Sequence, residues 1–425
     1  MTRRQTDIHH LRIGFISTRF SGTDGVSLET EKWAAVLEEM GHTCFYFAGM
    51  SDRPEEISYV VPEAFFHRPE MDELHDFLYS RTTRTAEVTE QIHQLKEHFK
   101  RHLYAFVARF DVDLLIVENA LSIPVHVPFG MAITELIAET GFPTIGHHHD
   151  MAWERERFQV NAVGDYLAMA FPPNLSSIRH VVINSVAASQ LAFRTGLSSR
   201  VIPNVMDYDN PPPAPDAYTA DVRADLGVKP GEKFILQPTR VVQRKGIEHA
   251  IELVSRLETP ARLVISHAAG DEGREYEKRV HYYASRMGVP AQFVAGRIQQ
   301  ERGMTPDGHK IYTLGDIYPY ADLVTYPSQI EGFGNAFLEA VYYRRPIVVN
   351  TYSIYELDIK PKGFQAIEFN GFITDACVEE ARRVLEDGVW VREMVETNYH
   401  IARRHYSFSI LKHHFQALIT ELFGI

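Results

Sequence analysis

The sequence predicts an α/β protein with two domains, each built on a parallel sheet. Short apolar runs alternate with longer segments of helical periodicity, which is typical of strands that helices bury on both faces. The 425 residues, 45% of them hydrophobic, are many for one core and sufficient for two. A proline-rich run at 210–215 marks the linker, because proline stiffens a chain and is excluded from sheet interiors.

The first half opens with an expected strand at 11–17 and a helix at 27–40. Gly22 and Gly25 lie in the loop between them, and Gly25 is our candidate for a close backbone contact with a ligand. Two glycines fall short of a full dinucleotide fingerprint, so a plain tight turn is the alternative. A helix is expected at 83–110, and further strands are expected at 114–117, 143–146 and 180–185.

Polar residues follow two of these strands at the carboxyl end, where parallel sheets bind ligands. Glu118 and Asn119 come after 114–117 and are candidates for binding an acceptor. Three consecutive histidines come after 143–146. Neighbours in an extended segment face opposite sides, so only His147 and His149 can share one, too few for a zinc site. We therefore predict no metal site.

The charged segment that follows the histidines offers further acceptor candidates. Asp150 directly follows His149, and Arg155 and Arg157 have the charge to bind an anionic acceptor. The alternative is a solvated helix start, which commonly carries such charges.

The second half resumes the alternation, with expected strands at 234–238, 262–266, 292–295, 322–326 and 346–350. Arg240 and Lys245 lie between the first of these strands and the next helix, at the crevice where open α/β sheets bind ligands. Two cations in that place would neutralise a diphosphate. A solvated basic turn is the alternative.

The strand at 322–326 leads into the most informative stretch of the chain. Glu331 and Glu339 flank two glycines that let the backbone turn tightly and approach a ligand. A helix then begins, and its unpaired N–H groups and positive dipole end suit a diphosphate or sugar oxygens. Asn335 is the expected cap. The candidate donor-binding residues of this stretch are Gly332, Phe333, Gly334, Asn335, Ala336 and Glu339.

These residues resemble the donor site of the retaining glycosyltransferases of family 4. The resemblance rests on Arg240, Lys245 and the pair Glu331 and Glu339 in a Pro-Ser-x-x-Glu-Gly-Phe-Gly setting. It implies two Rossmann-like domains facing a central cleft. We place the N-terminal acceptor domain at 1–206, the nucleotide-sugar domain at 207–402, and a C-terminal helix that crosses back to the first domain at 403–425.

The resemblance also implies roles for individual residues. Arg240 and Lys245 would stabilise the departing diphosphate, Glu331 would bind a sugar hydroxyl, and His149 would reach the primary-hydroxyl end of the donor sugar. Glu339 would accept from the ribose, and the loop of Arg297 and Ile298 would hold the base. Asp111 and Asp113 precede their strand, away from the ligand edge. No metal cofactor is expected to be essential, although Mg²⁺ is possible.

The acceptor segment further resembles the subgroup that makes small soluble glycosides, such as the mannosylglucosylglycerate synthases. The implied reaction moves a hexose from GDP-mannose or UDP-glucose to a hydroxyl of a small acceptor such as glucosylglycerate, giving a compatible solute with retained configuration. The alternatives are a lipid or polysaccharide acceptor, a nucleotide-sugar epimerase, or a sugar-nucleotide sensor without turnover.

The composition of the chain limits the classes of binding partner that we expect. The formal charge of −13 argues against nucleic acid and anionic membranes, which select basic surfaces. Two distant cysteines, Cys44 and Cys377, imply no disulfide framework, and no apolar leader opens the chain. We therefore expect a cytoplasmic enzyme whose partners are a nucleotide sugar and a small polar acceptor. Nothing in the sequence assigns an oligomeric state.

Overall fold

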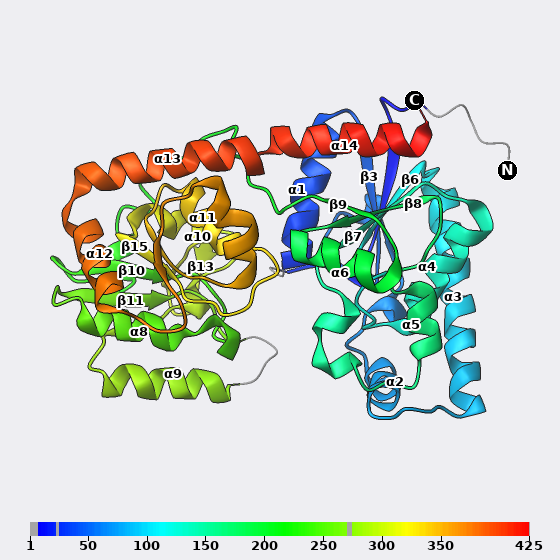
Figure 1. The fold of residues 1–425 in the computed structure, drawn as a ribbon, viewed down its shortest axis with the longest axis horizontal. Coiled ribbons are helices and arrows are strands. Elements are labelled where there is room, and N and C mark those ends of the chain that lie inside the picture. Colours follow the sequence, from blue (N-terminus) through cyan, green and yellow to red (C-terminus); the bar gives the residue numbers. More distant parts are fainter. Residues whose placement is uncertain (1–6, 23–24, 270–273, 425) are drawn as a thin grey trace. The chain divides into compact units, whose positions relative to one another are not determined.

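The computed structural model describes residues 7–22, 25–269 and 274–424 (Figure 1). Contacts divide the chain into two compact units. Residues up to Pro203 together with those from Phe408 onward form one unit, which we call the N-terminal domain, and Asn204–Ser407 form the C-terminal domain. The expected boundaries, 206/207 and 402/403, lie a few residues from these.

The N-terminal domain is built on a parallel sheet of seven described strands in the order β5-β3-β1-β6-β7-β8-β9. The chain builds β3 and β5 on one side of β1 and then returns to lay β6 to β9 on the other. The order of the strands therefore reverses between β1 and β6. The strands are β1 (Arg12–Ile16), β3 (Thr43–Ala48), β5 (Ser58–Val60), β6 (Leu114–Glu118), β7 (Thr144–His148), β8 (Ile178–Val182) and β9 (Ser199–Val201).

One core of this domain lies between the sheet and two long helices, α3 (Ala86–Phe110) and α4 (Val127–Thr140). Buried side chains recur along α3 at helical spacing, among them Phe99, Leu103 and Phe106. Burying each such side chain stabilises the fold by about 1.5–3 kcal/mol. The helix begins at Ala86 rather than Thr83, because the Thr85 hydroxyl accepts from the N–H of Val88 and caps it.

The last helix of the chain, α14 (Phe408–Phe423), packs on α1 (Gly25–Glu39), and Figure 1 shows the two side by side. The rings of Trp33 and Phe415 meet edge to face at 4.9 Å, and Lys412 forms an ion pair with Glu39. Apolar and charged contacts therefore both join the C-terminus to this domain. The remaining helices of the domain are α2 (Pro69–Tyr79), α5 (Gly164–Ala170) and α6 (Ser185–Thr195).

The C-terminal domain has a parallel sheet of six described strands in the order β12-β11-β10-β15-β16-β17. Here the order reverses between β10 and β15. The strands are β10 (Lys233–Gln237), β11 (Ala261–Ile265), β12 (Ala291–Phe293), β15 (Leu323–Tyr326), β16 (Ile347–Asn350) and β17 (Ile367–Phe369). The helices are α7 (Val222–Asp225), α8 (Ile247–Arg256), α9 (Glu275–Arg286), α10 (Leu314–Ile317), α11 (Asn335–Tyr342), α12 (Asp375–Glu386) and α13 (Gly388–Tyr406).

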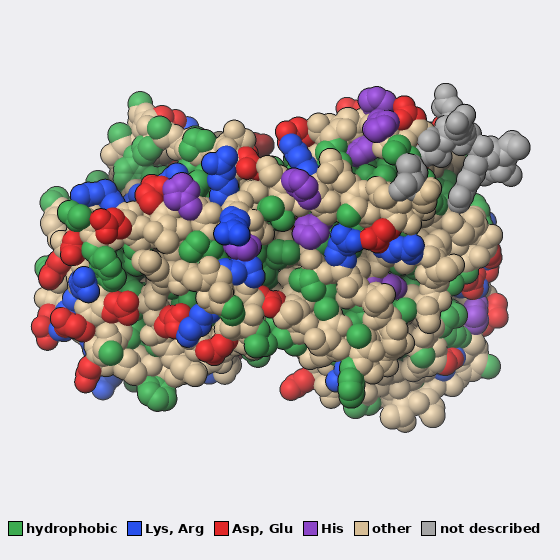
Figure 2. Space-filling model, turned by 45° about the horizontal axis from the view of Figure 1, so that its top comes forward, with side chains coloured by type: hydrophobic (Ala, Val, Ile, Leu, Met, Phe, Trp, Pro, Cys, Tyr) green, Lys and Arg blue, Asp and Glu red, His purple; other side chains and the backbone are tan. Residues whose placement is uncertain are grey.

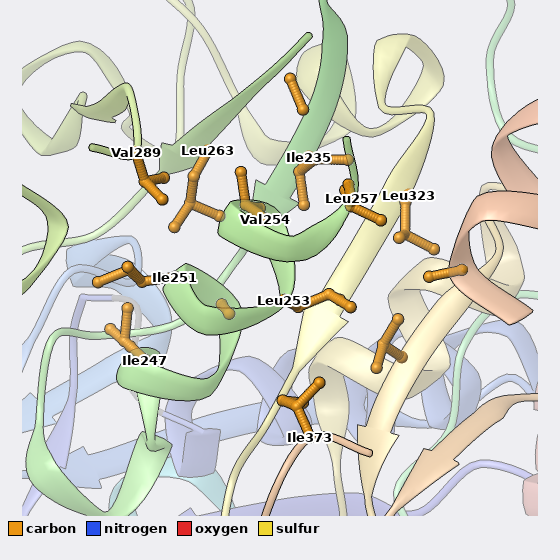
Figure 3. Close-up of a cluster of buried hydrophobic side chains, with 14 of the residues drawn as sticks. Ile235, Ile247, Ile251, Leu253, Val254, Leu257, Leu263, Val289, Leu323 and Ile373 are labelled. Atoms are coloured by element: carbon orange, nitrogen blue, oxygen red, sulfur yellow. The ribbon is translucent and has the colours of Figure 1, made fainter. Parts of the chain in front are cut away.

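Branched apolar side chains fill the core of this domain (Figure 3). Ile247, Ile251 and Leu253 of α8 are fully buried, as are Ile235 and Leu263 of the strands. Such residues suit strands that are covered on both faces, which is why the expected strands of the second half all occur.

Four described strands of the two large sheets were not among the strands expected from the sequence. β5, β9 and β17 have three residues each, too few to show a periodicity of their own, and β3 is an aromatic run directly after a helix. Hydrogen bonding to neighbouring strands holds such segments in the sheet, and the local sequence does not reveal that pairing. Within the described residues, no helix has the length and apolar character needed to cross a bilayer.

Candidate functional site

The reversal of strand order between β10 and β15 locates a candidate site in the C-terminal domain. Loops that leave neighbouring strands in opposite directions open a crevice at the carboxyl edge of the sheet, where α/β proteins bind ligands. The loop after β10 carries Arg240 and Lys245, and the loop after β15 carries Glu331 and the two glycines. Folding thus brings together two motifs that lie about 90 residues apart.

Lys245 and Glu331 form a direct ion pair between these loops. Their side chains are 11% and 10% exposed, and Arg244 approaches the other carboxylate oxygen at 3.5 Å. Burial alone would raise the pKa of Glu331, but the Lys245 ammonium reverses this and lowers it. Burial lowers the pKa of Lys245, and the carboxylate limits the fall. The pair holds one cation and one anion together in the loops that border the crevice.

Gly334 has a conformation that only glycine adopts readily. Its φ is +136°, and a Cβ there would lie 2.3 Å from the Tyr352 hydroxyl. That hydroxyl donates a 2.7 Å hydrogen bond to the carbonyl of Phe333 and so holds the loop. The glycine is thus required by both the backbone angle and the close approach of Tyr352.

The expected helix cap at Asn335 is wrong. Gly334 occupies the N-cap position and Asn335 is the first residue of α11. The Asn335 side-chain oxygen instead accepts a 2.6 Å hydrogen bond from Asn204. Without a side-chain cap, the first N–H groups of α11 keep their hydrogen-bonding capacity for another partner.

Glu339 lies inside α11 and is partly exposed. Its Oε2 accepts a 2.8 Å hydrogen bond from the hydroxyl of Tyr318, which is fully buried. Burial, and then the carboxylate, raise the pKa of Tyr318 well above its ordinary value, so the phenol stays protonated as the donor. Sequence reasoning missed Tyr318, because nothing in the local sequence pairs it with a residue 21 positions later.

Arg240 and His267 line the neighbouring part of this sheet edge. Arg240 is exposed, and His267 follows β11 with its Nδ1 2.7 Å from the Ser266 hydroxyl. Burial, with the nearby charges of Arg240 and Lys245, lowers the pKa of His267 to about 4. A neutral imidazole therefore stands beside the two cations.

Arg297, predicted to contact a base, has its guanidinium bound inside the domain. It forms an ion pair with Asp225 and donates a 2.7 Å hydrogen bond to the carbonyl of Lys310. Ile298 pairs with Tyr312 in an isolated bridge. The structure thus gives the Arg297 side chain a packing role, and a contact of this loop with a base stays a prediction.

A second cluster lies in the N-terminal domain, at the end of β6 and β7. The Oε2 atom of Glu118 is 2.9 Å from Nδ1 of His147 and 3.1 Å from Nε2 of His149. Glu118 is 0% exposed. His147 stacks on Trp33 with ring centroids 3.8 Å apart. Sequence reasoning paired the two histidines but missed that Glu118 and Trp33 meet them.

These three side chains bear on the question of a metal. Their ligand atoms lie within 4.8 Å of one another, so the structure adds a third potential ligand to the two histidines considered from the sequence. The carboxylate, however, contacts both rings directly at hydrogen-bond and ion-pair distances. A carboxylate that contacts two imidazole rings explains these distances without a metal ion, and the absence of a metal from this cluster stays a prediction.

The other acceptor candidates lie close to this cluster. The Asn119 side chain accepts hydrogen bonds from the backbone N–H of His149 and of Asp150, at 2.9 and 3.2 Å. Arg155 donates a 2.6 Å hydrogen bond to Asp150. The exposed Arg157 lies over the Phe158 ring at 4.7 Å. Asp150 and the two arginines thus remain open to a polar ligand, whereas Asn119 serves the backbone.

Gly25 is the first residue of α1 and is exposed. The two residues before it in the glycine loop, 23 and 24, lie outside the described residues. Gly22 has a φ of +82°, and its N–H is 3.1 Å from a carboxylate oxygen of Asp52. A contact of Gly25 with a ligand remains a prediction.

Comparison with known proteins agrees with this geometry. The family described as "Glycosyl transferases group 1" matches residues 219–400, which include the crevice of the C-terminal domain. The mannosylglucosylglycerate synthase of Thermotoga maritima is 31% identical over 435 aligned positions, covering 95% of this chain and 98% of its own. The mannosylglucosylglycerate synthase of Petrotoga mobilis is 31% identical over 394 aligned positions, which cover 84% of this chain and 86% of that protein.

Solved structures show the same fold at low sequence identity. Sucrose-phosphate synthase from Thermosynechococcus elongatus superposes with a TM-score of 0.67 at 16% identity, covering 97% of this chain and 99% of that one. Anabaena HepE, in complex with UDP-glucose, superposes with a TM-score of 0.64 at 14% identity, covering 98% of this chain and 100% of that one. Both sheets of this chain are accordingly Rossmann-like. The chain belongs to the group 1 glycosyltransferases and is a hexosyltransferase.

Proposed function

We propose that this enzyme moves a hexose from a nucleoside-diphosphate sugar to a hydroxyl of a small soluble acceptor, with retention of anomeric configuration. The observation that carries the proposal is the ion pair of Lys245 and Glu331 at the strand-order reversal, directly before the uncapped start of α11. A cation, a carboxylate and free N–H groups match the diphosphate and hydroxyls of such a donor.

The roles follow from the chemistry of each group. Lys245 has three N–H donors, so it can keep Glu331 and also bind a diphosphate oxygen, with Arg240 as a second cation. Negative charge grows on the diphosphate as the glycosidic bond breaks, and the two cations stabilise it. Glu331 then accepts from a sugar hydroxyl, and Glu339, oriented by Tyr318, accepts from the ribose.

Retention is proposed to proceed on one face of the sugar. A double displacement would need a carboxylate nucleophile about 5 Å from a second carboxylate acting as acid. Glu331 is instead bound to a lysine and Glu339 to a tyrosine. We therefore infer that the leaving diphosphate itself takes the proton of the acceptor hydroxyl.

We propose GDP-mannose or UDP-glucose as the donor and glucosylglycerate, or an acceptor of that kind, as the sugar acceptor. The support is the similarity to two mannosylglucosylglycerate synthases over most of the chain. An acceptor with a carboxylate suits Arg155 and Arg157, which lie beside the histidine cluster. The product would be a small soluble glycoside that serves as a compatible solute.

No metal is proposed to be essential. Asp113 accepts a 2.9 Å hydrogen bond from the N–H of Arg12 at the start of β1, and Asp111 ends α3. Both lie at the amino end of the sheet, away from its ligand edge. Two cationic side chains beside the proposed diphosphate position would neutralise its charge, as Mg²⁺ does in other enzymes.

Nucleic acid and membranes are not proposed as partners. Acidic and basic side chains are intermixed on the face shown in Figure 2. Lys96 and Lys100, two of the basic residues of the amphipathic helix α3, form ion pairs with Glu135 of α4 at 2.6 and 2.9 Å. A lipid-acceptor enzyme would bind vesicles of anionic phospholipid, and this chain is expected to stay in the supernatant.

A thermal-shift panel tests the donor site. GDP, UDP and ADP, each alone and as the nucleotide sugar, are compared, because a ligand that binds only the folded state raises the midpoint. One nucleotide series should raise it by several degrees. Product analysis with that donor and glucosylglycerate then gives the anomeric configuration by NMR. Absence of any shift, or donor conversion to an epimer without acceptor, would end the proposal.

A further inference from the structure

The N-terminal domain contains a second cluster of polar residues, which surrounds His149. Two of these residues, Glu118 and Asn119, were predicted from the sequence to bind the acceptor. Glu118 is the last residue of β6 and is 0% exposed, so its carboxylate cannot meet a solvent-borne ligand in this arrangement. Its Oε2 atom is 3.1 Å from Nε2 of His149. Since Nε2 is held by the carboxylate, Nδ1 is the ring nitrogen that remains for a ligand.

Asn119 holds the backbone of the same histidine. Its φ of 61° is in the left-handed region, which asparagine tolerates better than most residues. In that conformation its Oδ1 accepts from the N–H of His149 at 2.9 Å and from the N–H of Asp150 at 3.2 Å. The ring and the main chain of His149 are therefore held by two consecutive residues of the neighbouring strand end.

The surrounding groups keep the carboxylate in place. His147 reaches the same Oε2 at 2.9 Å, and its ring stacks on Trp33 of α1 at an angle of 15°. Both nitrogens of this ring are buried without a hydrogen bond in the described part of the chain, and Nδ1 meets the carboxylate only at ion-pair distance. This fits a neutral ring whose Nδ1 faces the carboxylate. Both imidazoles therefore contact one oxygen of Glu118, and their ring centroids lie 4.2 Å apart.

The charges facing His149 are those of Glu118 on β6, His147 on β7, Glu29 on α1, and Asp150 next in the chain. Burial alone would lower the pKa of His149, but the hydrogen bond to Glu118 and the charges of Glu118, Glu29 and Asp150 together outweigh it and raise the pKa. Burial lowers the pKa of His147. Burial would raise that of Glu118, and the two imidazoles instead lower it to about 2. The positive charge of the cluster thus belongs to His149.

We propose that Glu118 and Asn119 are positioning residues for His149, Glu118 through its ring and Asn119 through its backbone, so that Nδ1–H is offered to an oxygen of a bound sugar or phosphate. The inference rests on the proposed function for the role of His149 in transfer. The positioning itself is independent of that role and can be measured in the free protein.

The first experiment is an NMR titration of the full chain with ¹³C-labelled histidine, with His149 assigned from His149→Asn. In Glu118→Gln the pKa of His149 should fall by about one unit or more, because the neutral amide no longer favours the imidazolium. Glu97→Gln, an exposed glutamate of α3, is the matched control and should leave it unchanged. An unchanged His149 titration in Glu118→Gln would overturn the positioning.

The second experiment separates positioning from transfer. If His149 acts as the charged donor, the basic limb of the pH profile of kcat should move to lower pH in Glu118→Gln, with a smaller change in KM for the nucleotide sugar. Glu118→Asp keeps the negative charge, so the basic limb of its profile should lie between those of the parent and of Glu118→Gln. It also replaces Glu118→Gln as the test variant if that variant folds poorly. A shifted His149 titration with an unmoved profile would remove His149 from the reaction while leaving the positioning intact.

Substitutions of Asn119 test its proposed role in holding the backbone of His149. Asn119→Gly keeps the left-handed conformation and removes only the side chain, so kcat should fall about tenfold or more, while the thermal midpoint changes little and the His149 titration stays near that of the parent. Asn119→Asp keeps the acceptor oxygen and should recover most of the loss. Equal activity of Asn119→Gly and the parent enzyme would exclude the backbone role.

Discussion

Lys245 and Glu331 meet as a buried ion pair across the strand-order reversal of the C-terminal sheet. The two residues are 86 positions apart, and each comes from the loop after a different strand. Removing either partner leaves the other charged and buried, which is costly. The pair therefore couples the stability of this domain to its proposed donor site.

Lys245→Met should lower kcat/KM for the donor by about 10²–10³, because one of two cations at the proposed diphosphate position is lost. It should also lower the thermal midpoint, since Glu331 loses its direct ion pair and faces the more distant cation of Arg244. Steady-state kinetics and calorimetry measure both. Lys278→Met on α9, whose side chain is 70% exposed, is the control. Parent-level turnover in Lys245→Met would exclude a role in leaving-group stabilisation.

Gly334→Ala should impair both folding stability and donor binding. A methyl group at this position would lie 2.3 Å from the Tyr352 hydroxyl in a backbone conformation that alanine disfavours. A loss of about 1–3 kcal/mol in the free energy of unfolding is expected. Gly388→Ala, at the start of α13, is the matched control, because the nearest atom is the flexible tip of Arg392 at 3.7 Å. Equal unfolding curves for the two variants would contradict the assignment.

Tyr318→Phe should weaken nucleotide binding more than it slows chemistry. The substitution removes only the hydroxyl that orients Glu339, and a buried hydrogen bond to a charged group is worth about 1.5–3 kcal/mol. The dissociation constant of the preferred nucleoside diphosphate should rise by about tenfold, measured by calorimetric titration. Tyr282→Phe, at a ring that is 67% exposed, should leave binding unchanged. A larger effect on kcat than on binding would argue against the ribose contact.

Acid should destabilise the N-terminal domain through buried histidines. Burial lowers the pKa of both His126 and His180 to about 4, below the value of about 6.5 in an unfolded chain. Between these values the unfolded state binds more protons, so their contribution is present above pH 6.5 and is lost as the pH falls to 4. The thermal midpoint should drop across this window.

The pH effect has an internal control. His180→Gln removes one of these two buried histidines and should make the dependence of the midpoint on pH less steep. His67→Gln, at a side chain that is 54% exposed, should not. A midpoint that rises between pH 6.5 and 5 in the parent protein would show that other groups dominate.

Chelation should leave transfer intact. With Arg240 and Lys245 at the proposed diphosphate position, turnover in EDTA should remain within about twofold of that in buffer alone. Radiolabelled donor and a purified acceptor give the rate. Activity that EDTA abolishes and Mg²⁺ restores would show that the cations of the protein do not suffice.

The sequence alone determined the class of this protein and the residues of its proposed donor motif. The strands at β10, β11 and β15 are short apolar runs whose neighbours are turn residues and helices, and such signals are local. Lys245, Glu331 and Gly334 could also be predicted locally, because each of the two motifs that contain them is a short contiguous stretch. The expected cap at Asn335 failed because Gly334, with its positive φ, takes that position and Asn204 engages the asparagine.

Only the tertiary structure decided which groups meet. His149 and Glu118 are 31 residues apart and touch because β6 and β7 are neighbours in the sheet. Tyr318 reaches Glu339, and Trp33 covers His147, through packing that no short window of sequence records. Burial then changed the function inferred for Glu118, from a contact of the acceptor to a support of His149. Spacing along a chain predicts which face a side chain takes, but strand order in the folded sheet determines its partner.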